Sequence, residues 1–479
     1  MQRLLLVLLV ATSYLLFAGG RPWTLAPLLA IVAGAAFLTP KRTFAIGGPW
    51  RSLDYALSAL LVAIGVQMVP LPAAIVAMLS PHRIEIINAT RLAQFGGTAP
   101  AWLTLSVDPF ATLIALGTVA LGVLTFWTAR AIFSAGGSTR SFCRALTFIG
   151  TLFAVVAVLQ KTVAPRSVLF LLEPDAQSAS PFGAFVNRNH FGGWLLMVAA
   201  PVAGYFVARS RIHPLRRGRW RESIGQIMSS GLVFTAIAVV ALVGILLLTL
   251  SRSALTGLGV AALVGWQLGR PRMNVERTNL PTTLGLIGAV LLVVVLFVDV
   301  DKWATRVAES FDTTPTPLSR ITIWQESLPI AKDFWLTGTG AGTFSDAMIP
   351  YQESRVWVGA MRRWAHFNNA HSHYLQVACE GGLLLSIPAL WALVSLGRLG
   401  HRAVRTDKGE MFWVRVGAAA GLAGLAAQSI WEIPLIMPAN AVMAGVLGGL
   451  LLYRREVRAE TTGPVTPELL TPPVRVKMA

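Results

Sequence analysis

Asn368 to Leu385 reads N-N-A-H-S-H-Y-L-Q-V-A-C-E-G-G-L-L-L and combines ionisable side chains with the start of an apolar run. It begins as a polar loop and passes within a few residues into an apolar run that continues to about Gly397. His371 and His373 therefore fall at the mouth of a predicted membrane helix, and Glu380 lies roughly two turns further in. Ionisable residues are costly at such a depth and are by default functional candidates. The stretch predicts a polar site at the end of a membrane span.

The composition is that of a polytopic membrane protein. Of the 479 residues, 54% are hydrophobic and 13% are charged, whereas about 25% charged residues are usual in soluble proteins. The apolar runs are long enough to cross a hydrocarbon core of about 30 Å as helices. The predicted fold is all-α with about 12 transmembrane helices, near residues 4–18, 23–38, 53–69, 109–129, 145–163, 190–208, 228–250, 254–269, 281–298, 372–397, 412–430 and 437–453.

The basic residues indicate the topology. Arginines concentrate in the connections that follow the second, fourth, sixth, eighth and tenth predicted spans. The positive-inside rule places these connections and both termini in the cytoplasm. The net charge of +18 is therefore interpreted as a topology signal and an attraction to anionic membrane lipid, and no nucleic-acid partner is predicted. The first span could also be read as a signal peptide, and cleavage there would leave the orientation of every later span unchanged.

A long outer loop, Asp299 to Asn369, separates the ninth and tenth predicted spans and contains five tryptophans. Loops of this length usually have structure of their own and carry function. Leu318 to Phe334 is predicted to form an amphipathic helix that ends before the turn cluster Gly338 to Gly342. The predicted organisation is one transmembrane domain, residues 1–453, which includes the outer loop at 299–370, followed by a disordered cytoplasmic tail at 454–479.

Two arginines are candidates for binding an anion. Arg252 is the only charged residue between Ser223 and Gln267, in a hairpin so short that it must lie near the membrane surface. It is either a snorkelling arginine at a helix end or a clamp whose guanidinium matches phosphate oxygens. Arg320 opens the predicted amphipathic helix, with Trp324 one turn later on the same face. It either stacks on that tryptophan or supplies a second cation to the same anion.

His371 is the candidate general base, because a neutral imidazole readily accepts a proton; the alternative is a histidine that caps the helix. His366, His371 and His373 lack a fourth ligand at a recognisable spacing, so no metal is predicted. His373 and Glu380 are seven residues apart and share a helix face, so a structural pair between them is a further alternative.

Two asparagines, Asn187 and Asn189, precede the sixth predicted span and either cap that helix or bind sugar. The glycines from Gly338 to Gly342 follow no predicted strand and are interpreted as a turn, so no nucleotide cofactor is predicted.

Four short motifs in this order resemble the O-antigen ligase and polymerase superfamily of bacterial membrane glycosyltransferases: Phe185-Val-Asn187-Arg-Asn189, Ser251-Arg252-Ser253, Arg320-Ile-Thr-Ile-Trp324, and His371-Ser372 followed by Gly382. The number of predicted spans and the large outer loop before the histidine also resemble the family. One position departs from it. The ligases have a second glycine three residues after the first, and Leu385 stands there in this chain.

The resemblance implies a GT-C-like membrane fold with the active site facing the periplasm, in the inner membrane of a bacterium. The implied donor is a glycan on undecaprenyl diphosphate, and the implied acceptor is lipid A-core, as in lipopolysaccharide biosynthesis. At the positions that match the family motifs, the resemblance implies that Arg252 and Arg320 hold the diphosphate and that His371 activates the acceptor hydroxyl. Further candidate contacts to the glycan or acceptor are Asn187, Asn189, Trp324, Ser372 and Glu380. Family members of the ligase kind need no metal or other cofactor.

Two alternatives stay open at this point. A polymerase of the same superfamily would use another lipid-linked glycan as its acceptor, and the acceptor is not separable by sequence. A transporter of small anions is an alternative from a different class, although the spans show no symmetry between the two halves of the chain of the kind that transporters often have.

Overall fold

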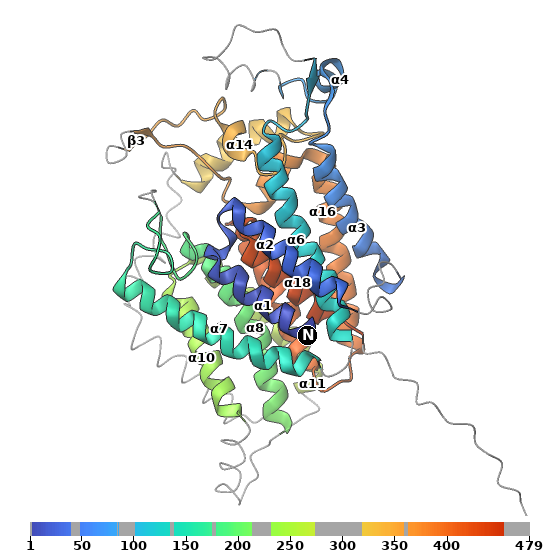
Figure 1. Cartoon of the computed structure of the whole chain (residues 1–479), viewed down its shortest axis with the longest axis vertical. Coiled ribbons are helices and arrows are strands. Elements are labelled where there is room, and N and C mark those ends of the chain that lie inside the picture. The colour runs from blue at the N-terminus through green and yellow to red at the C-terminus, as the bar shows by residue number, and fades with distance from the viewer. Residues whose placement is uncertain are drawn as a thin grey trace, which may run out of the picture.

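The computed structural model describes residues 2–39, 48–83, 85, 101–134, 138–174, 179–212, 231–273, 319–358 and 363–454. Long helices dominate these ranges (Figure 1): α1 (Gln2–Leu15), α2 (Leu25–Phe37), α3 (Arg51–Val66), α6 (Pro109–Ser134), α7 (Ser138–Val163), α8 (Arg188–Ile212), α10 (Leu232–Leu248), α11 (Arg252–Met273), α16 (His373–Thr406), α17 (Phe412–Gln428) and α18 (Pro438–Leu452). Each of them coincides with a predicted span. The ninth predicted span, residues 281–298, and the tail from residue 455 lie outside the described residues.

Within the described residues, four helices are long and apolar enough to cross a membrane by length and composition: Pro109–Ser134, Thr139–Val163, Arg188–Arg211 and His373–Thr406. Four further apolar helices are shorter: Gln2–Leu15, Pro22–Phe37, Leu232–Leu248 and Pro438–Leu452. This agrees with the predicted all-α membrane protein. The number of spans and the GT-C-like arrangement stay predictions.

Helix α8 lies at the centre of the bundle. Of its apolar window, 83% is buried, against 33–44% for the other three long spans. Small residues let the neighbouring helix α17 approach its backbone closely. A Cβ added at Gly204 would lie 2.1 Å from the carbonyl oxygen of Trp413, and one at Gly417 would lie 2.3 Å from that of Ala200. Close packing also reaches the start of α8, since a Cβ added at Gly193 would lie 2.6 Å from Gln428 Oε1.

Different helix starts and ends meet at the two ends of the bundle, one of which carries the arginine-rich connections and is called the basic end. At the basic end, the end of α6 meets the start of α3, where Arg130 Nη1 pairs with Asp54 Oδ1 at 2.9 Å. At the opposite end, Asn440 at the start of α18 donates to the carbonyl oxygen of His190 in α8 at 3.1 Å. The end of α17 is also there, since Gln428 donates to the carbonyl oxygen of Asn189 at 2.8 Å. This alternation of helix starts and ends agrees with the predicted order of spans.

Two arginines, Arg130 and Arg415, are buried inside helices. Arg130 belongs to α6, which runs to Ser134 and not to about residue 129, and its side chain is buried against Asp54. Arg415 belongs to α17 and donates to Asp407 and to the carbonyl oxygens of Leu451 and Tyr453. Because Asp54 satisfies the guanidinium group of Arg130, α6 continues past the apolar run on which its predicted end was based, whereas α17 begins at Phe412 as predicted.

The described part of the outer loop forms a small folded layer at the other end of the bundle. The predicted amphipathic helix is confirmed as α14 (Arg320–Asp333), which Ser319 caps by accepting from Thr322 N at 3.2 Å. Ile323, Ile330 and Phe334 of this layer pack with Phe344 and with Cys379 of α16. The remaining short elements are β1 (Leu71–Pro72), α4 (Ala73–Leu79), β2 (Trp102–Leu103), α15 (Phe344–Met348), β3 (Trp357–Val358) and β4 (Arg363–Trp364), with 3-10 turns η1 (Phe17–Gly19), η2 (Pro22–Thr24), η4 (Gly48–Trp50) and η6 (Pro434–Ile436). Strand β1 pairs with β2 and β3 with β4, both antiparallel.

Helix α16 is interrupted at Gly382, whose φ of 50° and ψ of −147° are not helical. The outer loop satisfies the backbone groups at this break. Leu383 N donates to the carbonyl oxygen of Trp335 at 2.7 Å, and Gly340 N donates to that of Glu380 at 2.9 Å. Gly338, Gly340 and Gly342 all have positive φ, so the predicted turn cluster is confirmed. The loop that carries Arg320 is thus fastened to the helix that follows His371.

Candidate active site

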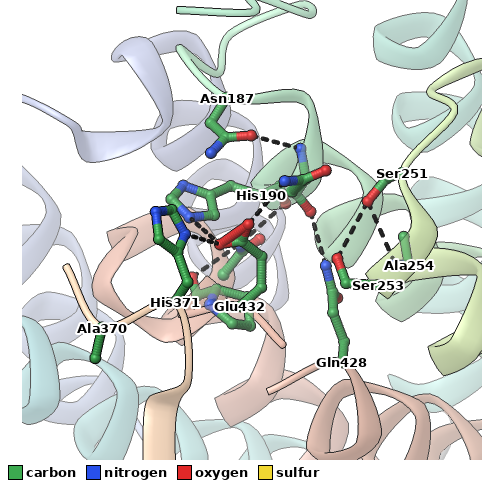
Figure 2. A network of polar contacts seen from close by, with 12 residues as sticks. Asn187, His190, Ser251, Ser253, Ala254, Ala370, His371, Gln428 and Glu432 are labelled. Atoms are coloured by element: carbon green, nitrogen blue, oxygen red, sulfur yellow. Dashed lines mark hydrogen bonds and ion pairs between the residues drawn. The ribbon is translucent and has the colours of Figure 1, made fainter. Parts of the chain in front are cut away.

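One carboxylate, that of Glu432, joins residues from three distant parts of the chain. Glu432 follows α17 in the connection that leads to η6, and its side chain is 1% exposed. Its Oε1 accepts hydrogen bonds from Asn189 Nδ2 at 2.7 Å and from Arg320 Nη2 at 3.1 Å. Its Oε2 lies 3.4 Å from His371 Nδ1. Figure 2 shows the carboxylate at the centre of this polar network.

His371 is held on both sides by the local backbone. It has a φ of 48°, a conformation that is uncommon for residues other than glycine and that occurs often at functional sites. The preceding residue, Ala370, accepts a hydrogen bond from Trp324 Nε1 at 2.8 Å, and the following residue, Ser372, is the N-cap of α16. The His371 side chain remains 35% exposed. Its imidazole therefore contacts Glu432 on one side and is open to a substrate on the other.

Glu432 is ionised over the whole physiological range. Burial by itself raises the pKa of this carboxyl group. The hydrogen bond from His371 and the nearby charges of His190, His371 and Arg320 outweigh burial and lower the pKa to about 2. The site thus contains one buried negative charge that faces one guanidinium and two imidazoles.

Arg320 lies at the first position of α14, directly after its Ser319 cap. Its side chain is 31% exposed, and only Nη2 is engaged with Glu432 in the contact at 3.1 Å. A guanidinium has five N–H donors, so the group keeps donors for an incoming anion. Because the free N–H groups of a helix N-terminus also favour negative charge, the start of α14 is suited to a phosphate.

Arg252 is the exposed first residue of α11 and is placed at the same end of the bundle by packing. The preceding residue, Ser251, accepts from Ala254 N at 3.3 Å and caps the helix. A Cβ added at Gly192 in α8 would lie 2.6 Å from the Cβ of Ala254, so the starts of α8 and α11 are in close contact. Ala254, two residues after Arg252, thus contacts the beginning of α8. Asn189 belongs to the same part of α8, so Arg252 and Asn189 lie at the same end of the bundle.

The two asparagines have different surroundings. Asn187 Oδ1 accepts from the backbone N–H of Asn189 at 2.8 Å and caps the start of α8, which is the capping alternative. The Asn189 side chain instead donates to Glu432 and belongs to the polar network. The structure thus separates two residues that the sequence treated alike.

Two other residues predicted as candidate contacts have structural partners. Trp324 stacks on Trp431, with ring centroids 5.5 Å apart, and so supports the segments that carry His371 and Glu432. Ser372 is buried as the cap of α16.

Glu380 is part of the fastening between α16 and the outer loop. Its Oε2 accepts from Gly342 N at 2.8 Å, and its Oε1 accepts from Phe344 N at 3.2 Å and from Gln376 Nε2 at 3.0 Å. The suggested pair of His373 with Glu380 is wrong: among the described residues, no hydrogen bond or ion pair joins the two side chains, and Nδ1 of His373 is buried without a hydrogen-bond partner. The backbone N–H of His373 donates to the carbonyl oxygen of Ser429 at 2.9 Å.

The third histidine considered for a metal, His366, faces Gln352 Oε1 through Nδ1 at 3.2 Å and the carbonyl oxygen of Ser345 through Nε2 at 2.9 Å. In the ranges that the structure describes, no group of three or more His, Cys, Asp or Glu side chains is arranged to hold a metal ion. Cys143 and Cys379 are both free and buried.

Residues 237–390 match the sequence profile of the O-antigen ligase family. This match over about a third of the chain supports the O-antigen ligase superfamily. No curated protein matches the sequence. The family match supports an enzyme of the O-antigen ligase and polymerase type, a class that acts on a lipid-linked glycan and an acceptor, and the apolar helices agree with a membrane location.

The family segment contains only part of the polar network. Arg252, Arg320 and His371 lie inside residues 237–390, whereas Asn189 and Glu432 lie outside them. Glu432 was missed by sequence reasoning, although a signal was present. It is the only acidic residue between Glu410 and Glu456, in a short connection between two apolar runs. Like Arg252, it is a single ionisable residue in a short connection between apolar runs, a position where a charge is costly.

Proposed function

We propose that this protein transfers a glycan from undecaprenyl diphosphate to a lipid A-core acceptor, at the periplasmic face of the bacterial inner membrane. The observation that carries the proposal is the position of Glu432, which contacts both Arg320 and His371. A phosphate-binding group and a proton acceptor are thus held by one buried carboxylate. Such an arrangement suits the displacement of a diphosphate by a hydroxyl group.

His371 accepts the proton of the acceptor hydroxyl in this mechanism. Its Nδ1 faces the ionised Glu432, so Nδ1 carries the hydrogen and Nε2 presents its lone pair to the substrate. As the hydroxyl proton moves to Nε2, the hydroxyl oxygen bonds to the anomeric carbon of the donor sugar. The bond from that carbon to the diphosphate oxygen breaks, and its electron pair leaves with undecaprenyl diphosphate. Glu432 stabilises the imidazolium that forms.

Arg252 and Arg320 stabilise the leaving group. Negative charge grows on the departing diphosphate, and preorganised guanidinium groups are most effective where such charge develops. Arg320 is already oriented by Glu432 through Nη2, and its side chain is 31% exposed, so its other donors are available to the diphosphate. Arg252 supplies the second cation from the start of α11. No cofactor takes part in this scheme.

A polymerase, whose acceptor is a second lipid-linked glycan, is the other candidate, and Leu385 favours it. This residue stands where the ligases have glycine, and its side chain is buried in an apolar cluster with Ala63, Ile64 and Ala341. The interior behind the break in α16 is therefore filled by a leucine. The proposed chemistry at His371 is the same for both acceptors.

Deletion of the gene, followed by gel analysis of surface glycans and of the extracted lipid carrier, tests the proposal. Long chains that accumulate on undecaprenyl diphosphate and disappear from lipid A-core would identify a ligase. Single repeats on the carrier would identify a polymerase. If neither pool changes, the proposed function is wrong, and uptake of small anions would then be measured in proteoliposomes.

A further inference from the structure

A second imidazole faces the same carboxylate oxygen as His371. The Nε2 atom of His190 lies 3.9 Å from Glu432 Oε2, the oxygen that is 3.4 Å from His371 Nδ1 (Figure 2). His190 is buried, and its Nε2 has no hydrogen-bond partner within the described ranges. Glu432 Oε2 is thus the charged acceptor towards which this nitrogen is directed.

His190 is fixed in place by its own helix and by α18. Its backbone N–H donates to the carbonyl oxygen of Asn187 at 3.1 Å, in the first turn of α8. Its carbonyl oxygen accepts from Asn440 Nδ2 at 3.1 Å. Because α8 is the most buried of the long spans, the residue has little freedom to move away from Glu432.

We propose that His190 is a positioning residue that shares one oxygen of Glu432 with His371 and thereby sets the pH range in which His371 can accept a proton. The part of this inference that concerns catalysis rests on the proposed function. The part that concerns the protonation of His371 does not, and it can be measured without a glycan substrate.

The direction of the effect follows from electrostatics and is the same for both protonation states of His190. When His190 is neutral, its Nε2–H withdraws charge from Oε2, which then attracts a protonated His371 less strongly. When His190 is protonated, it also repels a positive charge on His371. In either state the side chain of His190 disfavours the protonated form of His371. Groups that share a carboxylate in this way titrate as one coupled unit.

The other charged groups near this unit stay the same in a His190 variant. Arg320 reaches the carboxylate from α14 through Oε1, on the other oxygen. Arg188 and Arg252 are the first residues of α8 and α11, two helices that pack against each other. The remaining partner, Asn189, is neutral. A change in the titration of His371 would therefore report on His190 itself.

The rate at which diethyl pyrocarbonate modifies His371, measured against pH by mass spectrometry of the full-length protein in detergent, tests the inference. This reagent attacks only the unprotonated imidazole, and the His371 side chain is 35% exposed. The variants are His190→Phe, which removes the donor, and His190→Gln, whose amide nitrogen reaches the position of Nε2. His401, which is exposed near the far end of α16, serves as the internal control.

In His190→Phe, the midpoint of His371 modification should move up by about half a pH unit, which lowers its rate at acidic pH about threefold. His190→Gln should restore the wild-type curve, and the His401 curve should coincide in all three proteins. An unchanged or downward-shifted His371 curve in His190→Phe would overturn the inference. If that variant does not insert, His190→Asn replaces it, because its shorter amide cannot reach Oε2.

Failure of this inference is distinguishable from failure of the proposed function. A shifted His371 curve in a protein that transfers no glycan would support the role of His190 in proton affinity and refute the proposed reaction. Normal glycan transfer together with identical His371 curves in all variants would support the proposed reaction and refute the role of His190.

Discussion

Replacement of Glu432 by glutamine changes the charge of the site and almost nothing in its shape. The amide can still accept from Asn189 through its oxygen, as Oε1 does at 2.7 Å. It cannot balance the charge of Arg320, and it presents an amide nitrogen towards His371 or Arg320 whichever way it is turned. We expect Glu432→Gln to insert into the membrane and to lose nearly all transfer activity.

The magnitude follows from the shifted pKa of Glu432. Its fall from 4.5 to about 2 corresponds to roughly 3 kcal/mol in favour of the ionised over the neutral side chain. The neutral glutamine therefore lowers the free energy of unfolding by up to about this amount, and less where water reaches the partly exposed Arg320 and His371. For transfer, the loss of an oriented proton acceptor costs about a hundredfold to ten-thousandfold in rate.

The assay compares the rate of glycan transfer and the thermal unfolding of Glu432→Gln with those of wild type. Glu410→Gln is the matched control, because Glu410 is exposed and pairs with the exposed Arg140 at 2.9 Å, an ion pair of little energetic weight. The control should transfer at the wild-type rate. A Glu432→Gln protein that is folded and transfers within about threefold of wild type would refute the assignment of Glu432 to the site.

Three further expectations concern the same network and its support. Arg320→Lys should lower the rate of transfer by about tenfold or more, because the lysine ammonium lacks the planar set of donors with which a guanidinium can bind Glu432 and a diphosphate at once. A wild-type rate in this variant would assign Arg320 to packing. Gly382→Ala should destabilise the protein by about 1–3 kcal/mol in thermal unfolding, since its Cβ would lie 2.6 Å from the carbonyl oxygen of Trp335, whereas Gly397→Ala in the same helix meets open space and should be neutral. Acid titration of unfolding should show that the contribution of Glu432, complete above a pH of about 4.5, is lost as the pH falls towards 2, and this loss should be absent from Glu432→Gln.

The sequence predicted the helices well and their ends less well. Apolar runs of membrane length are a strong signal, and the described long helices coincide with predicted spans. The ends were misplaced where a charged residue has a buried partner. Arg130 was expected to close a span, but α6 continues to Ser134 because Asp54 of α3 neutralises the charge. A partner 76 residues away cannot be inferred from an apolar run.

The candidate site was predictable as a set of single residues and not as a network. Arg320 and His371 were selected because each is ionisable near a predicted span, and the structure places both on Glu432. The same reasoning also selected Glu380, which serves the fold, because depth in the membrane does not reveal that the N–H groups of Gly342 and Phe344 are its partners. Glu432 and His190 become candidates once the fold brings the start of α8 next to the connection that follows α17.

Reconstitution from purified components would show whether a single site containing His371 transfers a lipid-linked glycan. Purified wild type and His371→Ala would be placed in proteoliposomes with a glycan on undecaprenyl diphosphate and a lipid A-core acceptor, and the glycosylated acceptor would be measured over time. We expect product with wild type and none above background with His371→Ala. Equal rates with the two proteins, or no product with folded wild type and either lipid A-core or a second lipid-linked glycan as acceptor, would contradict the account.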